Sequence, residues 1–137
     1  MASNKTITIL MMDAPYEQAR TSTAFRLLHA ALQLGFSLRI FAYEGAVSLP
    51  VTQQKPHANA LHGRSLEEEE HPNPHTWVSA LLARAHERGL GFDWVNCGLC
   101  VDERGVNDAI AGTRRGSPAD LWKMAQASDN VLVIATK

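Results

Sequence analysis

The chain alternates short, almost continuously apolar runs with segments of helical periodicity, and this alternation constrains its fold more than any other feature. Residues 6–12 (TITILMM) form the first run, a helical pattern follows at about residues 21–34, and a second run covers residues 37–44. Thr21 or Ser22 is the expected N-cap of that helix. Continuous apolar runs are typical of strands buried on both faces, as in parallel sheets. Together, these segments predict a βαβ unit with a right-handed crossover.

The alternation continues in the second half of the chain. The pattern predicts a helix over residues 75–88, a short strand over 92–96 and a last buried strand over 131–135. Before that last strand, Pro118 follows Ser117 in the arrangement of a first helical residue behind its N-cap. The sequence therefore predicts an α/β fold, with a mostly parallel sheet and helices on both faces.

Residues 45–75 interrupt this alternation. The segment holds four prolines, four histidines and an acidic run, and it predicts a long loop with a short helical turn around residues 65–70. Loops of this length are uncommon inside compact domains, and they tend to be functional or disordered. We interpret the chain as one domain over residues 1–137, with a loop insertion at about 45–75.

Size and charge exclude several classes of protein. The 137 residues suit one domain, and the formal net charge of -1 gives no basic excess for nucleic-acid binding. No run approaches the roughly 20 apolar residues of a spanning helix, and the apolar start is short for a signal peptide. We therefore expect a cytoplasmic protein with no membrane span and no direct contact with nucleic acid.

Both cysteines of the chain lie in one short stretch, DWVNCGLCVDERGV, as Cys97 and Cys100. Cys97 directly follows a predicted strand, and in parallel α/β sheets reactive groups lie just beyond the carboxyl ends of the strands. The loops after Met12 and Glu44 should open on the same edge. We therefore expect the long loop to lie over the cysteines.

Some residues around the cysteines favour a reactive thiolate, and others oppose it. A thiol at a strand end meets free backbone N–H groups, which favour the thiolate. Gly98 permits close backbone approach or a positive φ next to the sulfur. Arg104 can add positive charge, and the acidic pair Asp102 and Glu103 opposes it.

Four interpretations of the cysteine pair compete on the residues alone. Two buried, inert thiols are common in folded proteins. A zinc site would need two of the loop histidines, whose spacing matches no standard pattern: His57, His62, His71 and His75. A CxxC pair also suits a thiol-disulfide oxidoreductase, whereas a persulfide carrier needs only one nucleophilic cysteine. In a reducing compartment, chemistry or metal binding is more typical of such a pair than a structural bridge.

Two further residues end predicted strands at the same edge of the sheet. Asp13 follows the first strand and Tyr43 lies at the end of the second, so both are candidate pocket-lining residues together with Gly98 and Arg104. Other notable side chains are interpreted as structural. The expected core residues are Trp77, Trp94 and Trp122, and the expected surface residues are Glu67 to Glu70, Arg114 and Arg115.

The first loop does not have the form of a nucleotide-hydrolysing site. Residues 13–23 (DAPYEQARTST) lack the glycines and the lysine of a P-loop. The segment does follow the first strand and carry three consecutive hydroxyl-bearing residues, as a flavin phosphate loop does. Flavin binding is the weaker alternative, and we expect no cofactor.

The segment C-G-L-C-V-D-E-R-G-V, residues 97–106, resembles the DsrE/TusD-like (DsrE/DsrF-like) family of small sulfurtransferases. Family members carry a strand, then a cysteine, then a short helix that ends in an Arg-Gly-Val-like tail, in patterns such as C-V-A-A-A-x-R-R-G-V or C-x-x-C-x-x-x-R-G. Cys97 falls on the family cysteine, and residues 104–106 fall on the Arg-Gly-Val tail. The opening residues 11–47 and the closing residues 116–134 are also similar to the family. Residues of about 48–74 are not covered, and Asp102 and Glu103 replace small residues.

The resemblance implies a flavodoxin-like α/β fold and a homo-oligomer, either a trimer or a hexamer. It implies that Cys97 accepts sulfane sulfur as a persulfide from a donor protein and passes it to an acceptor protein. Cys100 would then be a second carrier or a resolving thiol, and the reverse order of the two cysteines stays open. A CxxC oxidoreductase and a non-catalytic binding or assembly subunit remain the alternatives.

Overall fold

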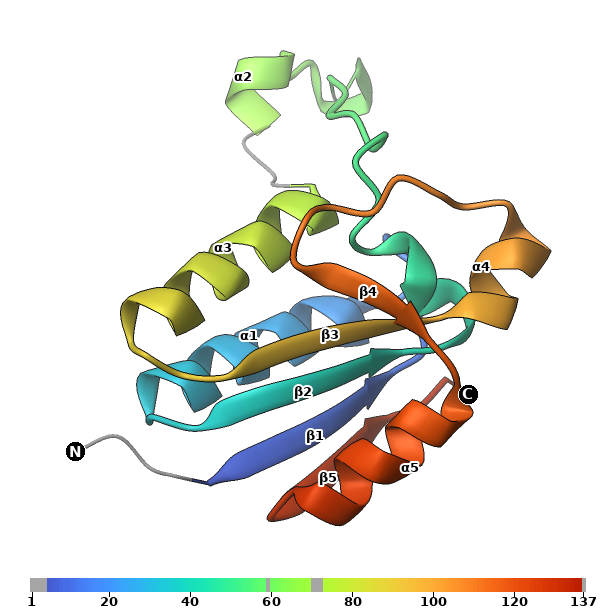
Figure 1. The fold of residues 1–137 in the computed structure, drawn as a ribbon. Helices are drawn as coiled ribbons and strands as arrows, with labels where there is room; N and C mark the ends of the chain where they lie inside the picture. Colours follow the sequence, from blue (N-terminus) through green and yellow to red (C-terminus); the bar gives the residue numbers. More distant parts are fainter. Residues whose placement is uncertain (1–4, 59, 70–72, 137) are drawn as a thin grey trace.

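The computed structural model describes residues 5–58, 60–69 and 73–136, and within them the chain forms one five-stranded parallel sheet (Figure 1). The strand order is β4-β3-β2-β1-β5. Every pair of neighbouring strands is parallel. The strands are β1 (Thr6–Met11), β2 (Ser37–Ala42), β3 (Phe92–Cys97), β4 (Thr113–Gly116) and β5 (Asn130–Ile134).

Helices cover both faces of this sheet, which confirms the predicted α/β architecture. The pair α1 (Ala19–Gln33) and α3 (Pro74–Glu87) packs on one face, and α5 (Pro118–Ala127) packs on the other (Figure 1). The short helix α4 (Gly98–Arg104) leaves the carboxyl end of β3. None of the helices in the described residues is long and apolar enough to cross a membrane.

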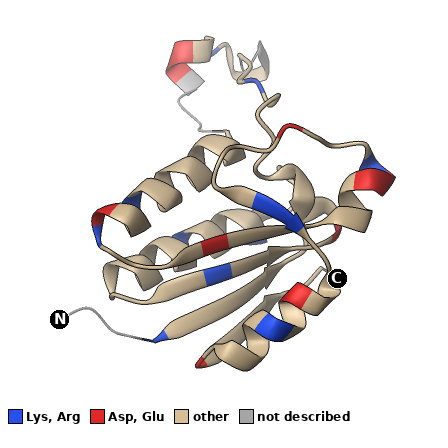
Figure 2. Cartoon of the chain, in the orientation of Figure 1, with Lys and Arg blue, Asp and Glu red and all other residues tan. Residues whose placement is uncertain are grey.

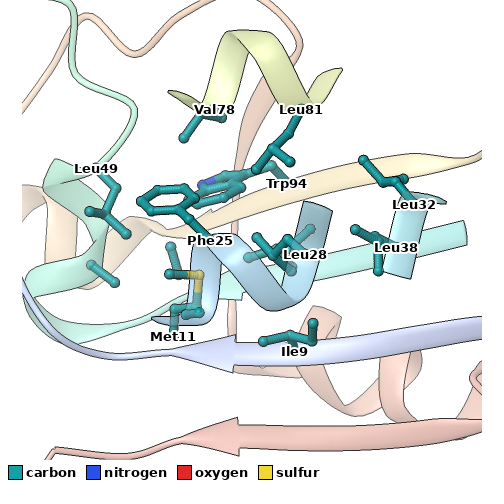
Figure 3. Close-up of a cluster of buried hydrophobic side chains, with 14 of the residues drawn as sticks. Ile9, Met11, Phe25, Leu28, Leu32, Leu38, Leu49, Val78, Leu81 and Trp94 are labelled. Atoms are coloured by element: carbon teal, nitrogen blue, oxygen red, sulfur yellow. The ribbon is translucent and has the colours of Figure 1, made fainter. Parts of the chain in front are cut away.

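The main core lies between the sheet and the α1–α3 pair. Phe25 and Leu28 of α1 meet Val78 and Leu81 of α3 above Trp94 of β3 (Figure 3). The Phe25 ring is stacked 6.4 Å from the Trp94 ring, between centroids. The Trp94 indole N–H donates a hydrogen bond to Asn96 Oδ1 at 3.0 Å, so this fully buried ring has no unsatisfied donor.

The long segment after β2 begins against the sheet and then leaves it. The 3₁₀ helix η1 (Glu44–Ser48) and Leu49 are packed on the domain, and Val51 forms an isolated bridge with Ala109. Farther on, η2 (Ala60–His62) and α2 (Leu66–Glu69) project away from the sheet (Figure 1). Among the described residues of the segment, only the first ones therefore approach the cysteines.

The two edges of the sheet differ from the prediction. β4 has the sequence Thr-Arg-Arg-Gly, with no apolar run to mark it as a strand. β5 was predicted as a buried strand, and that was wrong because Val131, Leu132 and Val133 are exposed at the opposite edge. A continuous apolar run identifies a strand without showing whether it is central.

Two predictions about helices were also wrong, and one was confirmed. α1 begins at Ala19 behind Gln18, so Thr21 lies inside the helix and is not its cap. Trp122 of α5 is 67% exposed, because it lies on the flank of the helix that faces the edge strand. Ser117 does precede α5, and its backbone N–H donates to Asp120 Oδ2 at 2.8 Å in a capping box.

Candidate functional site

The two cysteines lie where β3 passes into α4, at the carboxyl edge of the sheet. Cys97 is the last residue of β3 and the N-cap of α4, with extended backbone angles (φ -61°, ψ 116°). Cys100 follows within the first turn of the helix. The strand end and the helix start therefore bring the two thiols together. The position of Cys97 at the end of a strand is the one that the sequence predicted.

The Arg-Gly-Val tail explains why α4 is so short. Gly105 takes a left-handed conformation (φ 62°), which glycine adopts at little steric cost. The Val106 N–H then donates back to the Val101 carbonyl at 3.2 Å, closing the helix. This turn holds Arg104 beside the carboxyl edge of the sheet.

Both thiols are buried. The exposed fraction is 1% for Cys97 and 4% for Cys100, and neither forms a disulfide. They belong to a second, smaller core with Phe41, Val95 and Met124. A donor molecule can reach either sulfur only after the side chains that cover them move.

Cys100 is bound to the turn that follows β2. The Glu44 backbone N–H donates to Cys100 Sγ at 3.3 Å, and Glu44 itself is left-handed (φ 52°). Burial raises the pKa of the Cys100 thiol above its ordinary value, and the hydrogen bond with Cys97 raises it further. The Glu44 N–H opposes these effects because it favours the thiolate. At neutral pH, Cys100 is therefore held as the thiol.

We expect the part of this raised pKa that comes from burial to appear as slow alkylation of Cys100 in a Cys97→Ala variant, which removes the contribution of Cys97. The rate should follow the thiolate fraction, so its midpoint should lie above the value of about 8.5 for an ordinary thiol. A rate profile between pH 6 and pH 10 with a neutral alkylating reagent measures it. A midpoint at or below the ordinary value would contradict the buried environment assigned to Cys100.

Arg104, one of the predicted pocket residues, is paired with Glu44. Its Nη2 lies 2.8 Å from Glu44 Oε2, so its charge is already matched by a carboxylate. Asp13 is buried and paired with Arg20 at 3.2 Å. Asp13, Glu44 and Arg104 line one cavity of about 330 Å³ at the carboxyl edge of the sheet.

Tyr43 lies beside the cysteines and outside the residues that line this cavity. Its ring is stacked on Phe41, with 6.3 Å between the ring centroids. The negative charge of Glu44, followed by that of Cys100, raises the pKa of the Tyr43 hydroxyl. Tyr43 is therefore a neutral hydrogen-bond donor close to the thiols at physiological pH.

The structure adds one residue that sequence reasoning assigned to the surface. Arg115 of β4 forms two hydrogen bonds with the Asp102 carboxylate of α4, at 2.9 and 2.6 Å. Its guanidinium also lies against Gly98, between the two elements. The parallel β3–β4 register, which pairs Cys97 with Gly116, sets this position. No sequence signal marked it, because β4 has no apolar pattern.

The loop histidines that the structure describes do not gather around the cysteines. His57 and His62 are exposed, and His75 Nδ1 lies 2.9 Å from Gln54 Oε1. His71 and Glu70 lie outside the described residues. Within the described ranges, no group of three or more His, Cys, Asp or Glu side chains is placed to hold a metal ion. The geometry therefore gives no support to the zinc interpretation.

Comparisons with known proteins agree with the fold. The chain is 32% identical over 128 residues to the uncharacterized protein MK0008 of Methanopyrus kandleri, covering 92% of this chain and 91% of that one. It is 31% identical over 127 residues to the uncharacterized protein MJ0989 of Methanocaldococcus jannaschii, covering 91% and 96%. The crystal structure of the YchN protein from E. coli has the same fold, with a TM-score of 0.69 at 23% identity, over 95% of this chain and 99% of that one. The model of the DsrE/DsrF-like family matches residues 5–134, and the chain therefore belongs to this family.

Proposed function

We propose that this protein is a sulfur-relay protein that accepts sulfane sulfur as a persulfide on Cys97 and transfers it to a partner thiol. Family membership indicates sulfur relay as the general role. The observation that carries the specific proposal is the position of Cys97 at the β3–α4 junction, where the carboxyl edge of a parallel sheet normally holds reactive groups. The proposed partners are a sulfur-donor protein and an acceptor protein, and the proposed working form is a cytoplasmic homo-oligomer.

The proposed chemistry consists of two thiol exchanges. The Cys97 thiolate attacks the outer sulfur of a donor persulfide, the donor S–S bond breaks, and the donor leaves as a thiolate. In the second exchange, the acceptor thiolate attacks the outer sulfur of the Cys97 persulfide. The Cys97 S–S bond breaks, and Cys97 returns to the thiolate. No electrons are gained or lost overall, so neither step needs an oxidant.

Cys100 is positioned to interfere with the carrier, and its raised pKa limits this. If the Cys100 thiolate attacked the inner sulfur of the Cys97 persulfide, sulfide would leave and a disulfide would form. Because burial raises the pKa of Cys100, only a small fraction is thiolate at neutral pH. We propose that Cys100 supports the site as a thiol and resolves the persulfide only slowly.

Burial of both thiols favours a second candidate, a non-catalytic binding or assembly subunit whose thiols only fill a core. Free cysteines are often packed in this way, and Cys97 and Cys100 share a cluster with Phe41 and Val95. The two candidates differ in one respect that can be measured. A carrier must open far enough for a small sulfur donor to react, and a structural subunit need not.

Intact-mass spectrometry of the reduced protein after incubation with polysulfide tests the proposal. The wild type and Cys100→Ser should gain the mass of one or more sulfur atoms, and Cys97→Ser should gain none. If Cys97→Ser still gained sulfur and Cys100→Ser did not, Cys100 would be the sulfur-accepting nucleophile. A loss of two hydrogens without added sulfur would support the oxidoreductase, and no change in any form would favour the structural subunit.

A further inference from the structure

The Arg115–Asp102 pair lies at the start of α4, where the Arg115 guanidinium is packed against Gly98, the residue that follows the nucleophile assigned above. Arg115 lies in the strand next to β3, one residue before the Gly116 that pairs with Cys97. Asp102 lies in α4, which begins immediately after Cys97. The two hydrogen bonds between them therefore link β4, the strand next to β3, to α4, the helix that follows Cys97. The charged residues of β4 and α4 are marked in Figure 2.

Gly98 leaves the space that the guanidinium fills. A Cβ atom on residue 98 would lie 2.5 Å from Arg115 Nε and 2.9 Å from Cζ, distances at which two such atoms clash. Any side chain larger than that of glycine would therefore displace the guanidinium from the start of α4. The hydrogen bond and the charge of Asp102 raise the pKa of Arg115 most, and the charge of Cys97 raises it further.

We propose that Arg115 selects anionic sulfur donors for Cys97, with Asp102 as the internal competitor that holds the guanidinium in place until a donor arrives. The proposal rests on the sulfur-relay function above and names its substrate class. In addition to the donor protein proposed above, that class comprises donors whose transferable sulfur belongs to a small anion, such as thiosulfate or polysulfide. Arg115 is a positioning residue here, because it acts through charge and does not react.

The chemistry of a thiosulfate donor balances at this site. The Cys97 thiolate attacks the outer sulfur of thiosulfate, the S–S bond breaks, and sulfite leaves with the electron pair. Three negative charges are present on each side of the step, so a nearby cation lowers the repulsion between thiolate and dianion. A guanidinium suits this purpose because its planar fork binds oxyanions through two hydrogen bonds.

The exposure of the Arg115–Asp102 pair allows a donor anion to replace Asp102 on the guanidinium. The side chains of Arg115 and Asp102 are 56% and 60% exposed, and an exposed ion pair contributes little net stability. A competing anion can therefore take the place of Asp102 at modest cost. By contrast, Arg114 of the same strand is held by both Asp93 and Asp120, in a separate cluster at the β3–α5 side of the sheet.

Alkylation of Cys97 by two reagents of similar size and different charge tests the proposal in a Cys100→Ser background. The measured quantity is the rate with iodoacetate divided by the rate with iodoacetamide, because steric access affects both rates alike. We expect Arg115→Gln to lower this ratio roughly threefold to tenfold, the size expected for one charge acting over several ångströms near a protein surface. Asp102→Asn should raise the ratio, and Arg115→Lys should leave it close to the value of the parent protein. In 1 M salt, all these differences in the ratio should become smaller.

Sulfur loading separates this proposal from the proposed function. Arg115→Gln should slow loading from thiosulfate, and Arg114→Gln is the matched control that should not. An unchanged reagent ratio in both Arg115→Gln and Asp102→Asn would overturn the proposal and identify the pair as a simple tie between β4 and α4. If Arg115→Gln fails to fold, Asp102→Asn and Arg115→Lys still test it. The variants could also shift the reagent ratio as expected while the wild type takes up no sulfur from thiosulfate or polysulfide. That result would overturn the persulfide function and still support charge selection at Cys97.

Discussion

Replacing Trp94 with alanine should lower the free energy of unfolding by roughly 3–5 kcal/mol, the usual cost of truncating a buried tryptophan. Trp94 is fully buried on β3, an interior strand of the sheet, where it packs under α1 and α3. The change removes one of the two rings stacked on Phe25, the other being Trp77, and leaves Asn96 Oδ1 without its buried donor. Urea denaturation at one protein concentration measures the effect.

Trp122→Ala is the matched control, because it removes the same side chain from the surface of α5. Trp122 is 67% exposed, so its loss should change the free energy of unfolding by no more than about 0.5 kcal/mol. Equal losses for the two variants would contradict the packing described for the two faces of the sheet.

Gly45→Ala should destabilise the fold by about 1–3 kcal/mol, the usual range for overpacking. A Cβ atom on residue 45 would lie 2.7 Å from Ala14 Cβ and 2.9 Å from the Ala14 backbone nitrogen. The loop after β1 and the turn after β2 would therefore have to separate. The movement should also draw the Glu44 N–H away from Cys100 Sγ, so the pKa of Cys100 should rise further and its alkylation at neutral pH should slow.

Gly91→Ala is the control for this substitution. A Cβ atom on residue 91 would lie 3.4 Å from Ser37 Oγ, an ordinary contact that requires no movement. Thermal or urea unfolding of both variants, together with alkylation of Cys100, compares them directly. A Gly45→Ala protein as stable as Gly91→Ala, with unchanged Cys100 reactivity, would show that the two loops are not held in close contact.

Much of the fold could be predicted from the sequence because central parallel strands and their covering helices leave periodic patterns. Residues 6–12 and 37–44 contain β1 and β2, and Cys97 at the end of β3 follows from the same pattern. β4 and the exposure of β5 could not be predicted, since edge strands need not carry a distinctive apolar pattern. The family tail pointed to a helix after Cys97, and the structure places α4 there.

The charges around the cysteines were harder to predict than their position. Arg104 was expected to act on the thiol, and it is paired with Glu44. Asp102 was expected to oppose a nearby cation, and it binds Arg115 from the neighbouring strand. These partners depend on strand register and on the turn at Glu44, which are tertiary features that local patterns do not encode. Gly98 was expected to permit close backbone approach or a positive φ, and instead the Arg115 side chain packs against it at a φ that is not positive.

The most direct measurement locates the transferred sulfur in the unaltered protein. The reduced wild type is exposed briefly to polysulfide, trapped with an alkylating reagent and digested, and fragment ions separate Cys97 from Cys100. We expect an alkylated persulfide on Cys97, with Cys100 modified as a simple thiol or not at all. An added sulfur found only on Cys100, or on neither cysteine, would contradict it.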